Sequence, residues 1–291
     1  MITVIINPIS GGAPLGVARK RAELASTVAS SCGEAAEVFV TERKGHARDL
    51  ALGAVTRGAR LVIAWGGDGT MNEVASALVF GQTPLALVPA GSGNGLAREL
   101  GISRRPERAM ADAIGATART IDAGELGGRL FFNIAGVGFD AHVAACLDRD
   151  ISGRRGFAAY ARIAARELWA YRPVAYRIDD RVTARRVLLV TLANSPQFGN
   201  GARIAPAARL DDGRLDLVLF EESSRLSTVL AVPRLFTGGL SGLRGAATRQ
   251  VERVTIASED PMTFHVDGEP VQGGTCLEGR VHPGALNVCV R

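Results

Sequence analysis

Residues 61–74 read Leu-Val-Ile-Ala-Trp-Gly-Gly-Asp-Gly-Thr-Met-Asn-Glu-Val, and this stretch decides the fold. Leu61 to Trp65 is a short apolar run, typical of a buried strand in a parallel sheet. We expect a helix to begin near Met71, with Thr70 as its cap and the carboxylate of Glu73 in its first turn. The stretch therefore predicts a strand, a glycine-rich turn and a helix in succession.

The glycine-rich turn has the composition of an anion site. Glycines permit positive φ and leave no Cβ between the main chain and a ligand. The free N–H groups of a helix N-terminus attract anions such as phosphate. Asp68 in the middle of the turn would repel phosphate unless a cation lay between them, so the turn suggests a metal ion together with phosphate. The alternative is an ordinary loop between a strand and a helix.

A second loop has the same plan. Pro84 to Pro89 is another apolar strand, followed by the small residues of Ala90 to Arg98 and then a helix. Ser92 and Asn94 are the candidate donors in this loop. Loops that follow neighbouring parallel strands meet at the carboxyl edge of the sheet, where open α/β folds bind ligands.

These motifs resemble the diacylglycerol kinase catalytic family, which includes bacterial lipid kinases and the sphingosine and ceramide kinases. The similarity covers nearly the whole chain, in family order. Its blocks are 66–74 (Gly-Gly-Asp-Gly-Thr-Met-Asn-Glu-Val), 89–94 (Pro-Ala-Gly-Ser-Gly-Asn), 133–140, 194–201, 204–216 and 266–269 (Val-Asp-Gly-Glu).

The resemblance implies an ATP site and assigns residues to it. In this reading the nucleotide is cradled by Asn7, Thr41, Gly66, Gly67, Asp68, Gly69, Thr70, Met71, Asn72 and Ser92. Asp68 would belong to the network of metal and phosphate. The alternatives are a plain turn at Asn7 and a strand-end cap at Thr41.

Glu269 is the candidate proton acceptor, because related bacterial lipid kinases place their base at the matching position. A tight turn at Asp267-Gly268 can project the next side chain, and catalysis would require this carboxylate within hydrogen-bond reach of a lipid hydroxyl. The alternatives are a solvated Glu269 in an ordinary hairpin, or Asp68 as the base, as proposed for sphingosine kinases.

The resemblance also implies a Mg²⁺ ion at the Asp211-Asp212-Gly213 turn. Carried over by position, its ligands are the carboxylate of Asp212 and the main-chain oxygens of Arg209 and Arg214. Oxygen ligands suit such a hard cation. The alternative is a bare Asp-Gly turn.

One position departs from the family pattern. Many bacterial relatives carry Asn-Asp after the second glycine loop, whereas this chain carries Asn94-Gly95. The Gly-Ser-Gly-Asn form is closer to sphingosine and ceramide kinases, so the identity of the acceptor stays open.

The order of the predicted elements divides the chain in two. Residues 1–122 alternate strands and helices, which predicts a doubly wound α/β nucleotide-binding domain, similar by resemblance to NAD kinase and phosphofructokinase. Residues 123–291 are rich in strands and predict a β-rich sandwich for the lipid substrate. The resemblance suggests that the last strand returns to the first domain.

Individual segments follow from spacing and turn residues. The expected strands are 3–6, 37–40, 61–65, 85–88, 130–136, 174–178, 186–193, 215–220, 251–257, 262–266 and 285–290. The expected helices are 14–31, 46–56, 71–80, 106–116, 140–148 and 154–172. Residues 121–128 are expected to form a glycine-rich hairpin or linker.

The amino-acid composition limits the binding partners and the cellular compartment that we expect for this protein. The net charge of +5 and pI near 9.4 suit a nucleotide or an anionic membrane surface but are too weak to indicate nucleic acid. Four scattered cysteines without a Cys-x-x-Cys pair indicate buried free thiols, with neither a zinc site nor disulfides. The N-terminus lacks the pattern of a signal peptide, and no apolar run reaches the length of a membrane span. We expect a cytoplasmic protein that visits the membrane peripherally.

The helix expected at 154–172 has two distinct faces. An apolar face opposes a basic one that carries Arg155, Arg162 and Arg166, with Trp169 beside them. Such a stripe could lie on anionic lipid headgroups. The alternative, a helix packed on its sheet with a solvated charged face, is common.

Together these features predict an ATP- and Mg²⁺-dependent lipid kinase acting on a diacylglycerol-like or sphingoid lipid, with its active site between the two domains. The nearest alternative is an NAD kinase, which shares a Gly-Gly-Asp-Gly turn. An alternative of another class is a nucleotide-binding regulator without turnover. A homodimer is one open possibility for the assembly.

Overall fold

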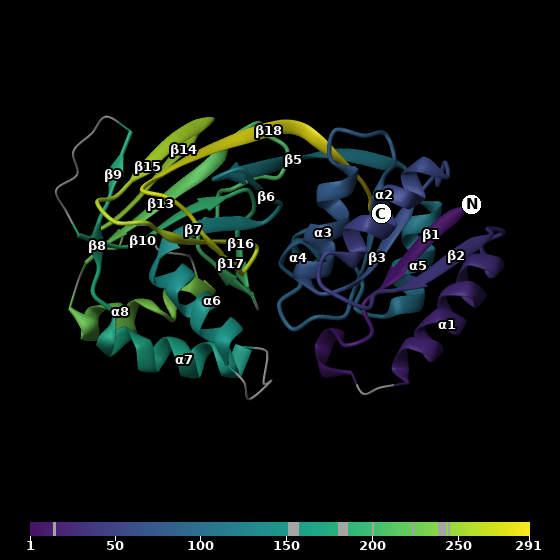
Figure 1. Cartoon of the computed structure of the whole chain (residues 1–291), viewed down its shortest axis with the longest axis horizontal. Coiled ribbons are helices and arrows are strands. Elements are labelled where there is room, and N and C mark those ends of the chain that lie inside the picture. The colour runs from purple at the N-terminus through teal and green to yellow at the C-terminus, as the bar shows by residue number, and fades with distance from the viewer. Residues whose placement is uncertain are drawn as a thin grey trace. The chain divides into compact units, whose positions relative to one another are not determined.

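The computed structural model describes residues 1–13, 16–150, 157–179, 186–199, 201–222, 224–237, 243 and 245–291. The chain forms two compact units. Unit 1 contains Met1–Ile121 and Gly284–Arg291, and unit 2 contains Asp122–Pro283. Both units are shown in Figure 1.

Unit 1 is an α/β layer structure. Its strands are β1 (Ile2–Ile6), β2 (Ala36–Val40), β3 (Val62–Gly66) and β4 (Leu85–Pro89). Its helices are η1 (Ser10–Gly12), α1 (Val17–Ser31), α2 (His46–Thr56), α3 (Asp68–Leu78), α4 (Gly95–Glu99) and α5 (Pro106–Gly115). The strands are parallel, in the order β2-β1-β3-β4.

Helices cover both faces of this sheet. Alternate residues of the strands, such as Val4 and Ile63, pack with α1 and α5 in one buried cluster. Helices α2 and α3 contact each other and strands β1 and β3, and their buried residues lie outside that cluster. This two-sided cover is the doubly wound arrangement predicted from the alternation of strands and helices.

Unit 2 consists mainly of strands. They are β5 (Ala118–Leu126, entering from unit 1), β6 (Arg129–Phe131), β7 (Ile134–Gly138), β8 (Val174–Ala175), β9 (Arg177–Ile178), β10 (Arg186–Ala193), β11 (Gln197–Gly199), β12 (Ala202–Arg203), β13 (Leu215–Glu221), β14 (Ala246–Val251), β15 (Arg253–Ala257), β16 (Thr263–Val266), β17 (Glu269–Gln272) and β18 (Cys276–Cys289). Its helices are α6 (Phe139–Arg149), α7 (Phe157–Ala170), α8 (Arg225–Ala231) and α9 (Arg234–Thr237).

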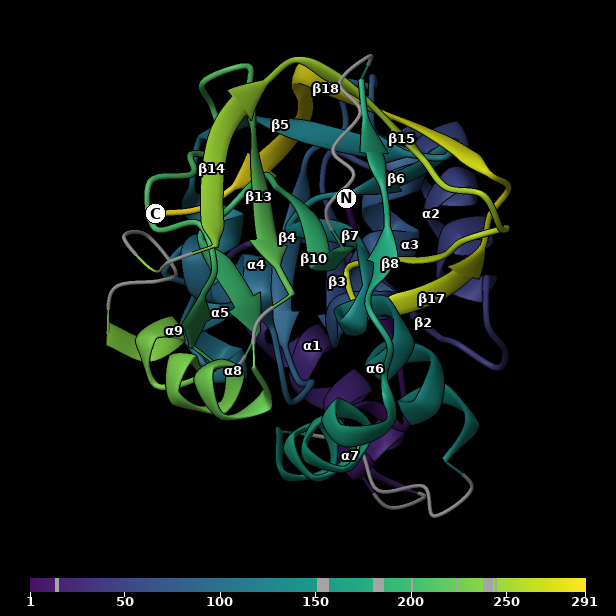
Figure 2. The ribbon, with the colours of Figure 1, turned by 90° about the vertical axis from the view of Figure 1, so that its left-hand side faces the viewer.

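The strands of unit 2 form a sandwich. One antiparallel sheet has the order β14-β13-β10-β7-β16-β17, and the facing strands include β15, β9 and the first part of β18. Side chains from both layers, such as Val190 and Ile256, form the buried core between them. A second cluster on the outer face of the first sheet contains Leu188, Phe139 of α6 and Ala231 of α8. Helices α6, α7 and α8 lie on this side (Figure 2).

Strand β18 begins in unit 2 and ends in unit 1. Its first residues pair antiparallel with β15, from Cys276 opposite Ala257 to Arg280 opposite Arg253. Near its other end Val288 pairs in parallel with Leu85 of β4. The last residues of the chain therefore belong to the sheet of unit 1.

Several expected boundaries were wrong. Helix α3 begins at Asp68 rather than near Met71, and its N-cap is Gly67, so Thr70 lies inside the helix and does not cap it. The hairpin expected at residues 121–128 is confirmed, although most of that segment is strand β5, which pairs with β6 across a turn at Gly127 and Gly128. The expected strands 130–136 and 174–178 are each divided into two. Residue 14 and residues 154–156, where two helices were expected to begin, lie outside the described residues.

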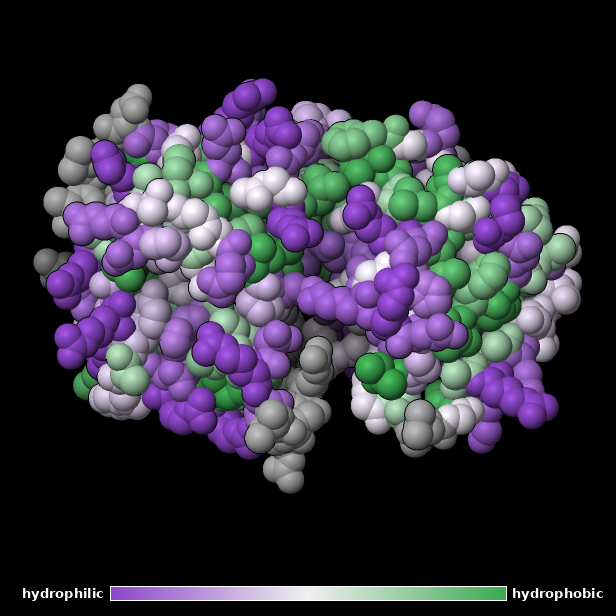
Figure 3. All heavy atoms as spheres, in the orientation of Figure 1, coloured by the Kyte–Doolittle hydropathy of each residue, from purple (hydrophilic) through white to green (hydrophobic). Residues whose placement is uncertain are grey.

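Other surface features differ from the expectation or bear on it. All four cysteines are free, but Cys32 and Cys276 are exposed rather than buried. None of the helices in the described parts of the chain has the length and apolar character needed to cross a membrane. On the face shown in Figure 3, hydrophilic and hydrophobic side chains are interspersed over both units.

Candidate functional site

The two glycine loops of unit 1 lie directly against each other. A Cβ on Gly91 would lie 2.6 Å from the Cα of Gly67, and one on Gly93 would lie 2.6 Å from Oδ2 of Asp68. Real Cβ atoms do not approach so closely, so this packing requires glycine at 91 and 93. The two motifs singled out in the sequence thus come together at the carboxyl ends of β3 and β4.

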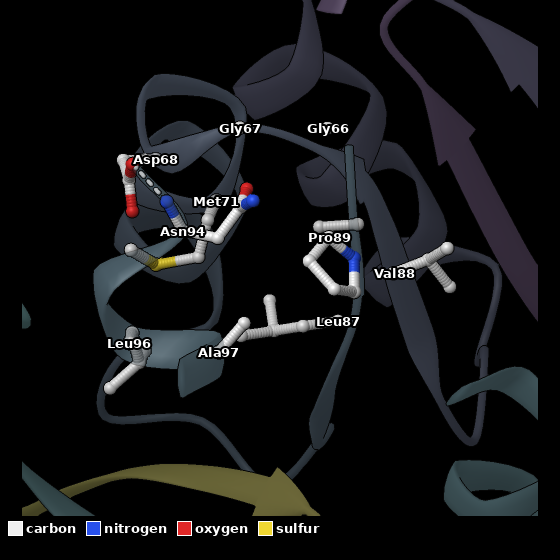
Figure 4. A pocket seen from close by; sticks show the side chains of 11 residues that line it. Gly66, Gly67, Asp68, Met71, Leu87, Val88, Pro89, Asn94, Leu96 and Ala97 are labelled. Atoms are coloured by element: carbon white, nitrogen blue, oxygen red, sulfur yellow. Dashed lines mark hydrogen bonds between the residues drawn. The ribbon is translucent and has the colours of Figure 1, made fainter. Parts of the chain in front are cut away.

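Asp68 joins the loops through its carboxylate. The main-chain N–H of Asn94 donates to Oδ2 at 2.8 Å, and that of Gly95 donates to Oδ1 at 2.7 Å. Burial raises the pKa of Asp68, although these N–H groups and the nearby Arg98 favour the charged form. Figure 4 shows Asp68 and Asn94 connected at the rim of a small pocket, which is otherwise lined mainly by apolar groups such as Leu87, Leu96 and Ala97. The carboxylate therefore holds both loops in place.

Asn94 supports its own loop. Its Oδ1 accepts the N–H of Gly91 at 2.9 Å, and its Nδ2 donates to the carbonyl of Gly91 at 2.6 Å. The side chain that sequence reasoning offered as a ligand donor is therefore engaged within the loop. Gly95, the position at which the sequence departs from the expected family pattern, is buried as the first residue of α4 and donates its N–H to Asp68.

The end of β1 is tied to α3. Nδ2 of Asn7 donates to Oγ1 of Thr70 at 2.9 Å, and Thr70 packs so close to Gly66 that a Cβ there would lie 2.5 Å from its side chain. Thr41 is buried at the end of β2, where its N–H donates to the carbonyl of Ile6. Asn7, Thr41 and the first glycine loop thus share the carboxyl edge of one sheet, as their positions after consecutive strands predicted.

Glu73 has a role that sequence reasoning missed. Its carboxylate accepts the N–H of Gly45 at 2.8 Å and that of Ala47 at 3.1 Å. Glu73 therefore caps the N-terminus of α2, in addition to placing a negative charge near the start of α3. A local pattern could not reveal this contact, because the partners lie in another helix.

Other members of the predicted cradle are more open. Ser92 is exposed, and Gly69 and Asn72 are half-buried in the first turns of α3. Met71 is buried and lines the pocket below the loops. Arg98, which sequence reasoning also missed, is exposed on α4 and donates from Nε to the carbonyl of Gly93 at 2.8 Å. It brings a positive charge to the second loop, which suits an anion.

In unit 2, Glu269 follows a rigid turn. Asp267 and Gly268 have φ values of 48° and 85° and form the two-residue loop between β16 and β17. The carboxylate of Asp267 accepts three main-chain N–H groups, from Phe132, Asn133 and Ile134, at 2.9–3.1 Å. This places Glu269, half-buried, at the first position of β17.

His265 braces the same turn from the other side. Its Nδ1 accepts the N–H of Gly268 at 3.3 Å, which leaves Nε2 to donate to Oδ2 of Asp140 at 3.2 Å. Both side chains are buried, and Thr191 also donates to Asp140 at 3.1 Å. A buried hydrogen-bonded network of this kind fixes the main chain that carries Glu269.

The acidic turn at 211–213 gathers negative charge. Oδ1 of Asp212 accepts the N–H of Arg214 at 3.1 Å, and Oδ2 of the buried Asp122 accepts the N–H of Gly213 at 2.7 Å. Burial, together with the charge of Asp212, raises the pKa of the neighbouring Asp216. A cation bound here would relieve that repulsion, and carboxylate and main-chain oxygens are of the kind Mg²⁺ prefers, although Oδ2 of Asp212 also accepts a hydrogen bond from Nε2 of Gln250 at 3.1 Å. The residues present therefore fit the predicted ion.

A different group of donors lies between α6 and α7. His142 Nε2 lies 2.9 Å from Oε2 of Glu167 and 3.7 Å from the sulfur of Cys146. Nitrogen and sulfur donors do not suit Mg²⁺. Because the imidazole and the carboxylate already bond each other directly, this contact serves to join the two helices.

The predicted residues are divided between the two units. Those assigned to the nucleotide lie in unit 1, whereas Glu269 at the start of β17 and the acidic turn that precedes β13 both belong to unit 2. An α/β unit with paired glycine loops, followed by a β-rich sandwich, defines the class of protein that the motifs predicted.

Comparison with known proteins agrees with this class. Residues 1–126 match the diacylglycerol kinase catalytic domain, and residues 133–290 match the YegS C-terminal NAD kinase beta sandwich-like domain. A probable YegS-like lipid kinase of Pseudomonas aeruginosa is 33% identical over 88% of this chain and 85% of its own length. One from Pseudomonas fluorescens is 34% identical over 87% and 84%.

A solved structure agrees with the fold. The crystal structure of a diacylglycerol kinase from Bacillus anthracis superposes with a TM-score of 0.75 at 18% identity, covering 100% of this chain and 96% of that one. The chain therefore belongs to the family of probable YegS-like lipid kinases, and it joins a diacylglycerol kinase catalytic domain to a YegS C-terminal domain.

Proposed function

We propose that this protein is an ATP- and Mg²⁺-dependent kinase that transfers the γ-phosphate to a hydroxyl of a diacylglycerol-like or sphingoid lipid. In this proposal, residues 1–122 bind the nucleotide and residues 123–291 bind the lipid. The proposal depends on one observation. Asp68 joins the two glycine loops at the carboxyl ends of β3 and β4.

The nucleotide part rests on the geometry of unit 1. Main-chain N–H groups at the start of α3 and the side chain of Ser92 are available at the edge where parallel sheets bind ligands. Arg98 adds a positive charge beside the second loop. Because Asp68 itself is engaged by two N–H groups, we propose that it supports the phosphate and metal network mainly by fixing the loops.

The acceptor part rests on Glu269. The turn that precedes it is braced by Asp267 on one side and by His265 on the other. A base held on such a rigid turn loses little entropy when it takes a proton from a hydroxyl. We propose that Asp212 and the main-chain oxygens of Arg209 and Arg214 would hold a Mg²⁺ ion, whose charge would offset that of the phosphate groups.

The names of the related proteins indicate where the reaction would take place. Relatives named as lipid kinases act, by that name, on lipids, and an acceptor of this kind is dissolved in a bilayer. We therefore propose a cytoplasmic protein that binds membranes peripherally, has no nucleic-acid partner, and is either a monomer or a homodimer.

The proposal is tested with radiolabelled ATP, Mg²⁺ and a total lipid extract, followed by identification of the labelled product. We expect label in a phospholipid product, and Glu269→Gln to lower the rate by about 10²-fold or more while ATP binding is kept. Exposed Glu278→Gln serves as the matched carboxylate control and should leave the rate unchanged.

Two outcomes would contradict the proposal. Label found in NADP, when NAD is supplied beside the lipids, would indicate an NAD kinase instead. ATP binding without any labelled acceptor, and without an effect of Glu269→Gln, would indicate a regulator that binds nucleotide.

A further inference from the structure

Exposed apolar side chains concentrate on one short part of unit 2. Of the twelve large hydrophobic side chains exposed in the described residues, five lie between Leu226 and Phe236. Leu226 and Leu230 are 67% and 68% exposed, and they are joined by Val229, Val232 and Phe236. Scattered exposed leucines are ordinary, but a contiguous group indicates a surface that binds something.

This exposure arises in an ordered helix. Ser224 caps α8 by accepting the N–H of Ser227, and Ala231 anchors the helix in the buried cluster outside the main sheet. Leu226, Val229 and Leu230 are spaced three and four residues apart, so they share one helical face. Because Ala231 is the buried residue of α8, that face points away from the protein core.

The end of α7 is joined to the start of α8. Nη2 of Arg225 donates to the carbonyl of Tyr171 at 2.6 Å, and Figures 1 and 2 both show α7 and α8 together at the bottom of the view. Trp169, in the last turn of α7, is 69% exposed, the highest value among the exposed large hydrophobic side chains described. Tryptophan is favoured where an apolar interior meets water at a membrane surface.

The charges around this face favour an anionic partner. Arg172 and Arg234 are exposed and, among the described residues, form no ion pair. In contrast, Arg162 and Arg166 of the basic stripe predicted for α7 pair with Asp150 and Glu167. The predicted α7 stripe is thus largely engaged within the protein. These two positive charges lie just after α7 and at the start of α9, and Glu222 is an exposed acid before α8.

We propose that the outer face of α8 and α9, together with Trp169, is the docking surface of this protein for an anionic lipid bilayer. The apolar side chains would enter the interfacial region while Arg172 and Arg234 meet lipid phosphates. This inference rests on the proposed function, because a lipid acceptor is what brings the protein to a bilayer. All the residues of the proposed docking surface belong to unit 2.

The test uses the full chain and vesicles of phosphatidylcholine with and without about one third phosphatidylglycerol, without ATP. Trp65 is buried and Trp169 is exposed, and the chain has only these two tryptophans. A blue shift of fluorescence on adding anionic vesicles therefore reports entry of Trp169 into the bilayer. Sedimentation of the vesicles gives the bound fraction.

Leu226→Ser/Leu230→Ser is expected to weaken binding to anionic vesicles by about tenfold or more, with no loss of folding because both side chains are exposed. The matched control is Leu52→Ser/Val55→Ser, a pair of exposed aliphatic residues on α2 that should leave binding unchanged. Arg172→Gln/Arg234→Gln should remove the preference for phosphatidylglycerol.

Other outcomes would overturn the inference. Wild-type protein that does not bind vesicles, or equal losses in both double variants, would exclude this surface. A wild-type dimer that the Leu226 and Leu230 substitutions convert to a monomer, without vesicle binding, would make the face a contact between copies. Vesicle binding that depends on α8, in a protein that phosphorylates no lipid, would keep this surface and reject the proposed kinase activity.

Discussion

At the scale of single residues, some glycines of this chain are required by close contacts, whereas others have space for a side chain. Gly91 is required by contact, because a Cβ would meet the Cα of Gly67 at 2.6 Å and Oδ1 of Asn94 at 3.0 Å. Gly115, at the end of α5, has no atom within 4 Å of the same hypothetical Cβ. The two positions therefore form a matched pair for testing the junction of the loops.

Gly91→Ala should separate the two loops. Overpacking against main chain typically costs about 1–3 kcal/mol, and displaced loops should weaken ATP binding by about tenfold or more, whereas Gly115→Ala should do neither. Urea unfolding and ATP titration would measure the two effects. Equal behaviour of the two variants would mean that the loops can part without consequence.

Much of the fold could be predicted, because short segments of the sequence indicate their own secondary structure. Apolar runs such as Leu61 to Trp65 located the central strands, and helical spacing gave α2 its observed bounds. Strand β14 was missed because four of its six residues are exposed and its sequence, Ala-Ala-Thr-Arg-Gln-Val, lacks an apolar run. Helices α8 and α9 were missed for another reason: they span only seven and four residues, too few for a helical repeat to stand out.

The candidate site was predictable as a set of residues but not as a set of contacts. The motifs indicated Asp68 and Glu269, yet the bonds from Asn94 and Gly95 to Asp68 depend on how two loops meet. Asp267 was treated only as a turn residue, although it holds the main chain of Phe132 to Ile134, which is distant in sequence. Hydrogen-bond partners of this kind are set by the tertiary fold, and a short sequence motif does not reveal them.

At the scale of elements, Glu125 joins β5 to β18 through Arg280 at 2.9 Å and His282 at 2.8 Å. Burial acts to raise the pKa of Glu125, but hydrogen bonds from His282 and Arg280 outweigh it and hold the pKa below its usual 4.5. A carboxylate with a lowered folded-state pKa stabilises the fold above its unfolded-state pKa, and this contribution is lost as the pH falls through the folded-state value.

Glu125→Gln should therefore lower the stability of the protein at pH 7, and its difference from wild type should shrink as the pH falls below 4.5. Urea midpoints measured from pH 7 down to about pH 3 would show this convergence. The exposed Glu278→Gln on β18 is the control and should change stability little. A difference that stayed constant with pH would show that the charge of Glu125 does not matter.

At the scale of the whole molecule, the last residues of the chain complete the sheet in which the chain begins. Leu286 and Val288 are fully or almost fully buried in unit 1, and Phe80 donates its N–H to the carbonyl of Ala285 at 2.7 Å. The integrity of the unit with the glycine loops therefore depends on a segment far away in sequence.

Leu286→Ala tests this dependence. Removing a buried leucine side chain should cost about 2–5 kcal/mol, whereas Leu52→Ala, at a side chain 46% exposed on α2, should cost far less. Hydrogen exchange would locate the damage: amides of β4 and α3 should exchange faster, while those of β10 and β13 in the sandwich of unit 2 keep their protection. Equal loss of protection in both units would instead mean that the chain unfolds as one cooperative body, in which the end of β18 stabilises both parts.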